Sequence, residues 1–104
     1  MQILDHTFSA LADPTRRAIL ARLAQSDATA GELAEPFAIS QPAISRHLKV
    51  LEAAHLIERH KVGQHQLCHL RSDALKAASD WLAFYSRFWS GSLDRLAVHL
   101  KETS

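Results

Sequence analysis

The sequence predicts a mostly helical α+β domain, in which four helices precede a small β-hairpin and a long helix follows it. Three observations support this fold class. Apolar residues recur at three- and four-residue steps through the first half of the chain. After residue 55 this period is lost, and two short stretches meet at a glycine. Helical spacing then returns from residue 73 onward.

The size of the chain fits a single domain. It has 104 residues, of which 47% are hydrophobic and 22% charged. Its longest apolar run, residues 81–85, is far shorter than the roughly 20 residues that cross a bilayer, and the N-terminus lacks the pattern of a signal peptide. The lone Cys68 cannot form an internal disulfide. We therefore expect one domain over residues 1–104, no membrane partner and a cytoplasmic location.

The first two helices are predicted from the spacing of apolar residues and from an N-cap signal at the start of the second helix. Residues at helical steps define a short first helix: Ile3, Leu4, Phe8 and Leu11. Asp13 and Pro14 begin the second helix, because aspartate caps free backbone N–H groups and proline fits the first helical position. We expect its buried side to contain Ile19, Leu20 and Leu23.

A helix-turn-helix is predicted over residues 29–54. Thr29 and Glu32 have the spacing of a capping box, which begins a third helix. This helix is short, because Pro36 disfavours helical backbone at the residue before it. Ser40 caps a fourth helix that continues to about residue 54.

Residues 56–70 predict a wing and residues 73–101 the C-terminal helices. The wing is a hairpin whose strands, 56–62 and 65–70, meet at a glycine-containing tip. The long helix has a nearly heptad row of apolar residues: Leu82, Tyr85, Trp89, Leu93, Leu96 and Leu100. The complete order of elements is that of a winged helix-turn-helix.

Positive charge is concentrated in the middle of the chain, although the net charge is only +1. Residues 1–40 contain three arginines and five acids. Residues 41–71 contain five lysines and arginines, two acids and five of the seven histidines. This distribution favours an anion-facing surface, but a solvated charged face has the same pattern.

The outer face of the predicted fourth helix is small, polar and basic. Ile44, Leu48 and Leu51 define its buried side. A face of this composition suits a DNA major groove, because small residues permit close approach and Arg, Lys and Gln can bind bases and phosphates. The predicted DNA-binding residues of this helix are Gln41, Pro42, Ser45, Arg46 and Lys49.

The predicted hairpin adds a second cationic surface. Cations on a narrow ribbon suit the minor groove or its flanking phosphates, and the predicted DNA-binding residues here are Arg59, Lys61, Gln64 and His65. A merely solvated hairpin is the alternative. His47 lies toward the buried side of the fourth helix, and we interpret it as a packed, hydrogen-bonded histidine.

Two segments resemble the ArsR family of winged-helix repressors: residues 8–20, which include Asp13-Pro14-Thr15-Arg16-Arg17, and residues 40–57, which include Ser45-Arg46-His47-Leu48-Lys49. The resemblance extends over about residues 3–100. It implies a homodimeric transcriptional regulator, usually a repressor, that binds an inverted-repeat operator. It also implies that Gln41, Ser45 and Arg46 read DNA and that residues 61–64 form the wing tip. His55 stands where the family usually has glycine.

The expected dimer interface consists of large apolar residues near both ends of the chain. They are too many for one thin core to bury, and the C-terminal helix resembles the family's dimer helix. The predicted interface contains Ile3, Leu4, Trp81, Tyr85, Phe88, Trp89, Leu93, Leu96 and Leu100. The alternative is that the long helix lies across its own domain.

Neither a metal nor a cofactor is expected. Metal-sensing members of the family need a Cys-x-Cys pattern in the third helix, and residues 31–35 contain no thiol. His99 and Glu102 match only a fragment of another metal site. Cys68 is predicted to be a packing residue, with redox sensing as the alternative. An inducer could thus be a small organic molecule or a partner protein, or there is none.

The predicted function is therefore sequence-specific DNA binding by a transcriptional repressor. The alternatives are a winged-helix module for protein contact and a metal- or redox-responsive repressor with an unusual site. We do not expect an enzyme, because the sequence contains no Gly-rich phosphate loop and no nucleophile elbow.

Overall fold

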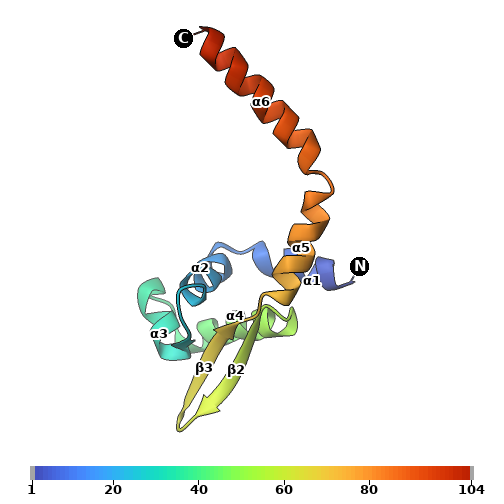
Figure 1. Cartoon of the computed structure of the whole chain (residues 1–104). Helices are drawn as coiled ribbons and strands as arrows, with labels where there is room; N and C mark the ends of the chain where they lie inside the picture. The colour runs from blue at the N-terminus through green and yellow to red at the C-terminus, as the bar shows by residue number, and fades with distance from the viewer. Residues whose placement is uncertain (1, 104) are drawn as a thin grey trace.

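A computed structural model describes the backbone of residues 2–103 and the side chains of residues 2–91 and 95–101 (Figure 1). Its elements are α1 (Gln2–Leu11), α2 (Pro14–Leu23), β1 (Ala28–Thr29), α3 (Ala30–Ala34), the 3-10 helix η1 (Glu35–Phe37), α4 (Gln41–Ala53), β2 (Ile57–Val62), β3 (His65–Leu70), α5 (Asp73–Ala83) and α6 (Ser86–Thr103). This order confirms the predicted α+β fold with a helix-turn-helix and a wing. No helix within the described residues is long and apolar enough to span a membrane.

The predicted start signals form the expected hydrogen bonds. The Asp13 carboxylate accepts a hydrogen bond from the backbone N–H of Arg16 at 3.0 Å, at the start of α2. Thr29 and Glu32 form a complete capping box at α3. The Ser40 hydroxyl accepts from the backbone N–H of Ala43 at 3.2 Å, at the start of α4. Each cap satisfies a backbone donor that has no partner within its helix.

The sheet has three antiparallel strands in the order β1-β3-β2. In the hairpin, Ile57 lies opposite Leu70 and Val62 opposite His65. The two-residue strand β1, which the sequence analysis did not predict, pairs Ala28 with Cys68. It anchors the start of the helix-turn-helix to the base of the wing.

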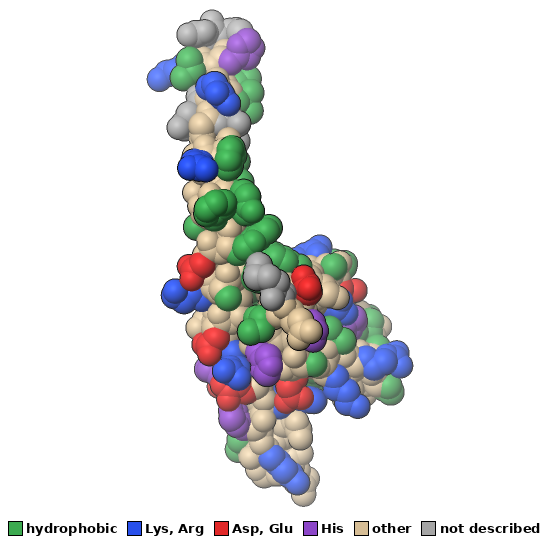
Figure 2. All heavy atoms as spheres, turned by 90° about the vertical axis from the view of Figure 1, so that its right-hand side faces the viewer, with side chains coloured by type: hydrophobic (Ala, Val, Ile, Leu, Met, Phe, Trp, Pro, Cys, Tyr) green, Lys and Arg blue, Asp and Glu red, His purple; other side chains and the backbone are tan. Residues whose placement is uncertain are grey.

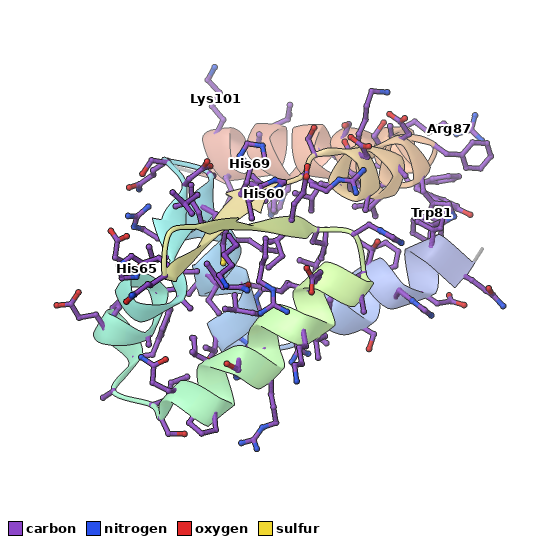
Figure 3. All side chains as sticks on the ribbon, turned by 90° about the horizontal axis from the view of Figure 1, so that it is seen from below. His60, His65, His69, Trp81, Arg87 and Lys101 are labelled. Carbon is purple, nitrogen blue, oxygen red and sulfur yellow. The ribbon has the colours of Figure 1, made fainter. Side chains whose placement is uncertain are left out.

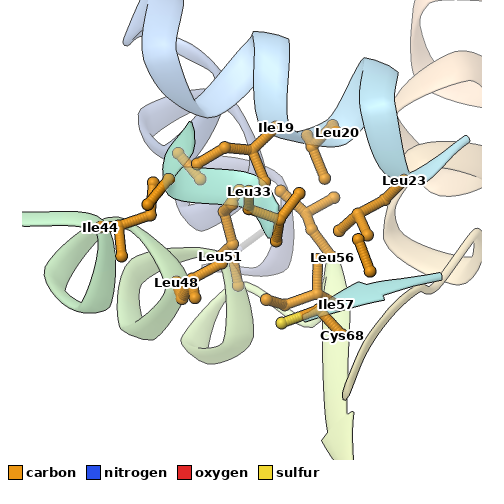
Figure 4. Packing of buried hydrophobic residues seen from close by; sticks show 14 of the residues in the cluster. Ile19, Leu20, Leu23, Leu33, Ile44, Leu48, Leu51, Leu56, Ile57 and Cys68 are labelled. Atoms are coloured by element: carbon orange, nitrogen blue, oxygen red, sulfur yellow. The ribbon is translucent and has the colours of Figure 1, made fainter. Parts of the chain in front are cut away.

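The hydrophobic core lies between α2, α3, α4 and the base of the sheet (Figure 4). Its largest fully buried apolar side chains are Ile19, Leu33, Ile44, Leu48, Leu51, Leu56 and Ile57. Cys68 is also completely buried, which confirms its interpretation as a packing residue. Because α4 contributes three of these side chains, the orientation of its opposite face is fixed by core packing.

The end of α4 is a left-handed cap formed by a histidine. His55 has φ of 60°. Its backbone N–H donates to the Glu52 carbonyl at 3.0 Å, and the N–H of Leu56 donates to the Leu51 carbonyl at 3.0 Å. These two bonds are those of a Schellman motif, which usually has glycine at the left-handed position. The helix thus ends where the sequence predicts, without the usual residue.

The C-terminal helices expected over residues 73–101 are α5 and α6, and the apolar row predicted for one long helix is divided between them. The N–H of Tyr85 donates to the Leu82 carbonyl and that of Phe88 to the Tyr85 carbonyl, both at 3.0 Å. These i to i+3 bonds interrupt the α-helical pattern between α5 and α6. Whereas α5 packs against α1, α6 projects away from the rest of the molecule (Figure 1). The alternative of a helix lying across its own domain is therefore wrong for α6.

Candidate nucleic-acid interface

The two sides of α4 differ as the sequence predicts. Ile44, Leu48 and Leu51 have no exposed surface. On the other side the predicted DNA-binding residues are exposed, apart from the half-buried Ser45: Gln41, Pro42, Arg46 and Lys49. Within the described part of the chain, neither Arg46 nor Lys49 has an ion-pair partner, so both positive charges are available to an anion.

His47 connects α4 to the first two helices, as its interpretation as a packed histidine requires. Its Nδ1 lies 3.3 Å from the Arg16 guanidinium and 3.9 Å from the Asp13 carboxylate. Arg16 also donates to the backbone carbonyls of Ala10 at 2.7 Å and Ser9 at 3.2 Å, at the end of α1. The hydrogen bond from the Arg16 backbone N–H holds the pKa of Asp13 below its usual value. One arginine therefore joins α1, α2 and α4.

The wing exposes three of its four predicted DNA-binding residues. Lys61, Gln64 and His65 are exposed near the tip, where Gly63 has φ of +62° and permits the tight turn. Figure 3 shows His65 near the tip and His60 and His69 farther back along the strands. The protruding hairpin thus exposes one lysine and two polar side chains near its tip.

Arg59 is placed differently from the other predicted wing residues. Its side chain is only 19% exposed, and its Nη2 donates to the Glu52 carboxylate of α4 at 2.8 Å. This hydrogen bond lowers the pKa of Glu52 and raises that of Arg59. Arg59 thus lies at the base of the wing with its charge already paired. The sequence gives no signal for this pairing, because it depends on how β2 leaves α4.

The large apolar residues predicted for a dimer interface remain substantially exposed in the single chain. Among them, Ile3 is 61%, Leu96 51% and Leu100 58% exposed, whereas Leu4 is half-buried. Trp81, Tyr85, Phe88 and Trp89 are also exposed, and Trp81 makes ring contacts with Phe8 at 5.6 Å and Tyr85 at 5.1 Å. Figure 2 shows hydrophobic side chains gathered where the projecting helix leaves the body. The side chain of Leu93 lies outside the described residues.

The described residues contain no group of three or more His, Cys, Asp or Glu side chains that could hold a metal ion. Glu102, one half of the fragment noted in the sequence, lies outside the described side chains. His69 instead pairs with Asp27 at 2.7 Å, a contact that the sequence analysis missed because the residues are far apart in the chain. Burial raises the pKa of the Cys68 thiol, which disfavours the reactive thiolate.

The helix α4 has the place of the recognition helix in a helix-turn-helix, and it presents a basic, exposed face beside a protruding wing. This arrangement defines a DNA-binding regulator of the winged helix-turn-helix class. Comparison with known proteins supports this class: a family described as a helix-turn-helix domain matches residues 11–60. The transcriptional repressor SdpR of Bacillus subtilis is 42% identical over 79 residues, which cover 76% of this chain and 88% of that protein. The HTH-type transcriptional regulator Rv2034 of Mycobacterium tuberculosis is 42% identical over 89 residues, covering 86% of this chain and 80% of the relative.

Solved structures agree with these relatives. The crystal structure of an ArsR family transcriptional regulator, RHA00566, matches with a TM-score of 0.79 and 39% identity over 86% of this chain and 92% of the other. An ArsR-like regulator from Rhodococcus sp. RHA1 matches with a TM-score of 0.72 and 32% identity over 91% and 90% of the two chains. The chain belongs to the ArsR family of DNA-binding transcriptional repressors. This is a family of regulators and not of enzymes.

Proposed function

We propose that two copies of this chain bind an inverted-repeat operator and thereby repress transcription. The observation on which this proposal depends is the outer face of α4, where Arg46 and Lys49 are exposed and unpaired within the described part of the chain. Phosphate attraction provides most of the affinity of such a face, and contacts with base edges provide the sequence preference.

Each copy places α4 in a major groove. Arg46 then binds guanine or a phosphate, and Gln41 at the helix start is suited to adenine. Pro42 and Ser45 permit close approach, while Lys49 contacts the backbone. The wing-tip residues Lys61, Gln64 and His65 follow the adjacent minor groove or its phosphates.

The two copies associate through their C-terminal helices and the start of α1. The support is the exposed apolar surface of α5 and α6, together with Ile3 and the half-buried Leu4, because surfaces of this kind mark interaction sites. A two-fold dimer presents its recognition helices about 34–36 Å apart, one turn of DNA, which explains an inverted repeat. We place this dimer in the cytoplasm, where the lone Cys68 stays reduced.

The first experiment identifies the operator. Genomic fragments retained by the purified full chain are sequenced, and the affinity for the enriched duplex is measured by fluorescence anisotropy over a range of salt concentrations. We expect an inverted repeat and a steep loss of affinity with rising salt. The absence of any duplex binding at low salt, together with capture of an acidic protein, would instead favour a protein-contact module.

The second experiment tests the α4 face. We expect Arg46→Ala to weaken operator binding at least several-fold, by roughly 1–3 kcal/mol if the guanidinium reads guanine. Lys76→Ala on α5 is the control, since it removes one exposed positive charge, which is paired with Asp80, from a helix outside the proposed DNA-contacting elements. Thermal unfolding of both variants confirms that each is folded. Equal affinities for the two variants would remove Arg46 from the interface.

A further inference from the structure

Arg59 occupies an unusual position for a cation on a DNA-binding wing. In the antiparallel register it lies opposite Cys68, which is completely buried. Successive side chains of a strand point to opposite faces, so Arg59 lies on the core side of the sheet, and the exposed His60 lies on the other side. Its Nε is buried and has no hydrogen-bond partner among the described residues. The side chain is thus held beneath the wing.

The partner of Arg59 lies on the recognition helix. Glu52 is in the last turn of α4, and its carboxylate accepts a hydrogen bond from Arg59 at 2.8 Å. The backbone that joins α4 to β2 is short and includes the left-handed His55. The ion pair therefore adds a side-chain connection between the two elements, besides the backbone link and the buried Ile57 at the start of β2. Because the pair is half-buried, solvent screens it less than a fully exposed surface pair.

We infer that Arg59 and Glu52 are positioning residues for DNA recognition, which fix the wing relative to the recognition helix. This inference rests on the proposed function, in which α4 and the wing tip contact DNA together. Neither side chain of the pair is a phosphate contact. Breaking the pair allows the hairpin to move relative to α4, so that the tip residues and Arg46 no longer reach their sites at the same time.

Because Glu52 is acidic, the inference predicts a change in DNA affinity opposite to the one expected from charge alone. An unpaired carboxylate near DNA repels the phosphates, so its neutralisation normally strengthens binding. If Glu52 positions the wing through Arg59, its neutralisation weakens binding instead. We expect Glu52→Gln and Arg59→Met each to weaken operator binding by roughly threefold to tenfold.

A double-mutant cycle distinguishes a coupled pair from two independent residues. Each single substitution already breaks the ion pair, so the second substitution has no further connection to remove. We therefore expect the operator affinity of the double variant, Glu52→Gln with Arg59→Met, to be close to that of either single variant. Thermal unfolding of all three variants, measured in parallel, identifies any that fails to fold. The double variant also avoids an unpaired charge, which makes it the variant best able to fold.

The salt dependence of binding separates positioning from direct contact. Removal of a residue that contacts a phosphate makes the plot of log binding constant against log salt concentration less steep, by about one unit of slope. We expect Lys61→Met at the wing tip to reduce the slope in this way, and Arg59→Met to leave it unchanged. Tighter binding by Glu52→Gln, or a reduced slope for Arg59→Met, would overturn the inference while leaving DNA binding intact. Loss of salt-dependent binding in the unmodified chain would instead contradict the proposed function.

Discussion

The winged body, residues 2–83, and the projecting arm, α6, use similar apolar residues in opposite ways. In the body, Leu33, Leu51 and Leu56 are completely buried between helices and the sheet. In the arm, Leu96 and Leu100 are 51% and 58% exposed. The difference teaches that apolar content does not determine burial. A body residue has elements packed on several sides, whereas the arm projects alone (Figure 1).

This contrast assigns different tasks to the two regions. The buried leucines of the body stabilise the individual chain, since their removal from water accompanies folding. The exposed residues of the arm are proposed to stabilise the association of two chains, because their burial requires a second surface. The stability that comes from the buried leucines should then be independent of protein concentration, whereas the stability that comes from the exposed apolar residues of α6 should depend on it.

The largest expected effect comes from the same substitution made in the two regions. Leu51→Ala should destabilise the chain by about 2–5 kcal/mol in urea unfolding, because it leaves a cavity in the core. Leu96→Ala in the arm is the matched variant. Its effect on the chain itself should be below about 0.5 kcal/mol, and any further loss should grow as protein concentration falls. Equal, concentration-independent losses would contradict the division of tasks.

A smaller effect is expected from a charge placed in the arm. Trp89→Asp removes an aromatic side chain whose burial contributes about 1.5–3 kcal/mol. The dissociation constant of the dimer, measured by sedimentation, should therefore rise at least about tenfold. Val98→Asp is the control, because nine residues along a helix place its side chain on the opposite face from Trp89. A Trp89→Asp variant that remains as dimeric as Val98→Asp would move the interface elsewhere.

The smallest effect concerns the turn between α4 and the wing. His55→Gly should stabilise the body by about 1 kcal/mol, because the left-handed conformation at φ of 60° is unfavourable for a residue with a Cβ. His55→Ala removes the imidazole but keeps the Cβ, and should not stabilise the chain. Chemical unfolding at one protein concentration compares the three chains. Stabilisation by both variants would point to the imidazole and not to the backbone.

Local signals made much of the body predictable. The caps at Asp13, Thr29 and Ser40 act within three residues, so the helix starts can be read from the sequence. The two sides of α4 were predictable for a similar reason, since helical periodicity places Ile44 opposite Arg46 without further information. The break before Ser86 was not predicted, because neither proline nor glycine marks it.

The sequence by itself determined the helices, the wing and the basic face of α4, because caps, turns and periodicity depend on neighbouring residues. Only the tertiary structure decided which positively charged side chains are free of internal partners and so available to bind DNA. It places His47 against Arg16, 31 residues away, and directs Arg59 beneath the sheet to Glu52. It also packs α5 against α1 and leaves α6 projecting. Such pairings depend on how completed elements approach one another in space, and no local pattern specifies that geometry.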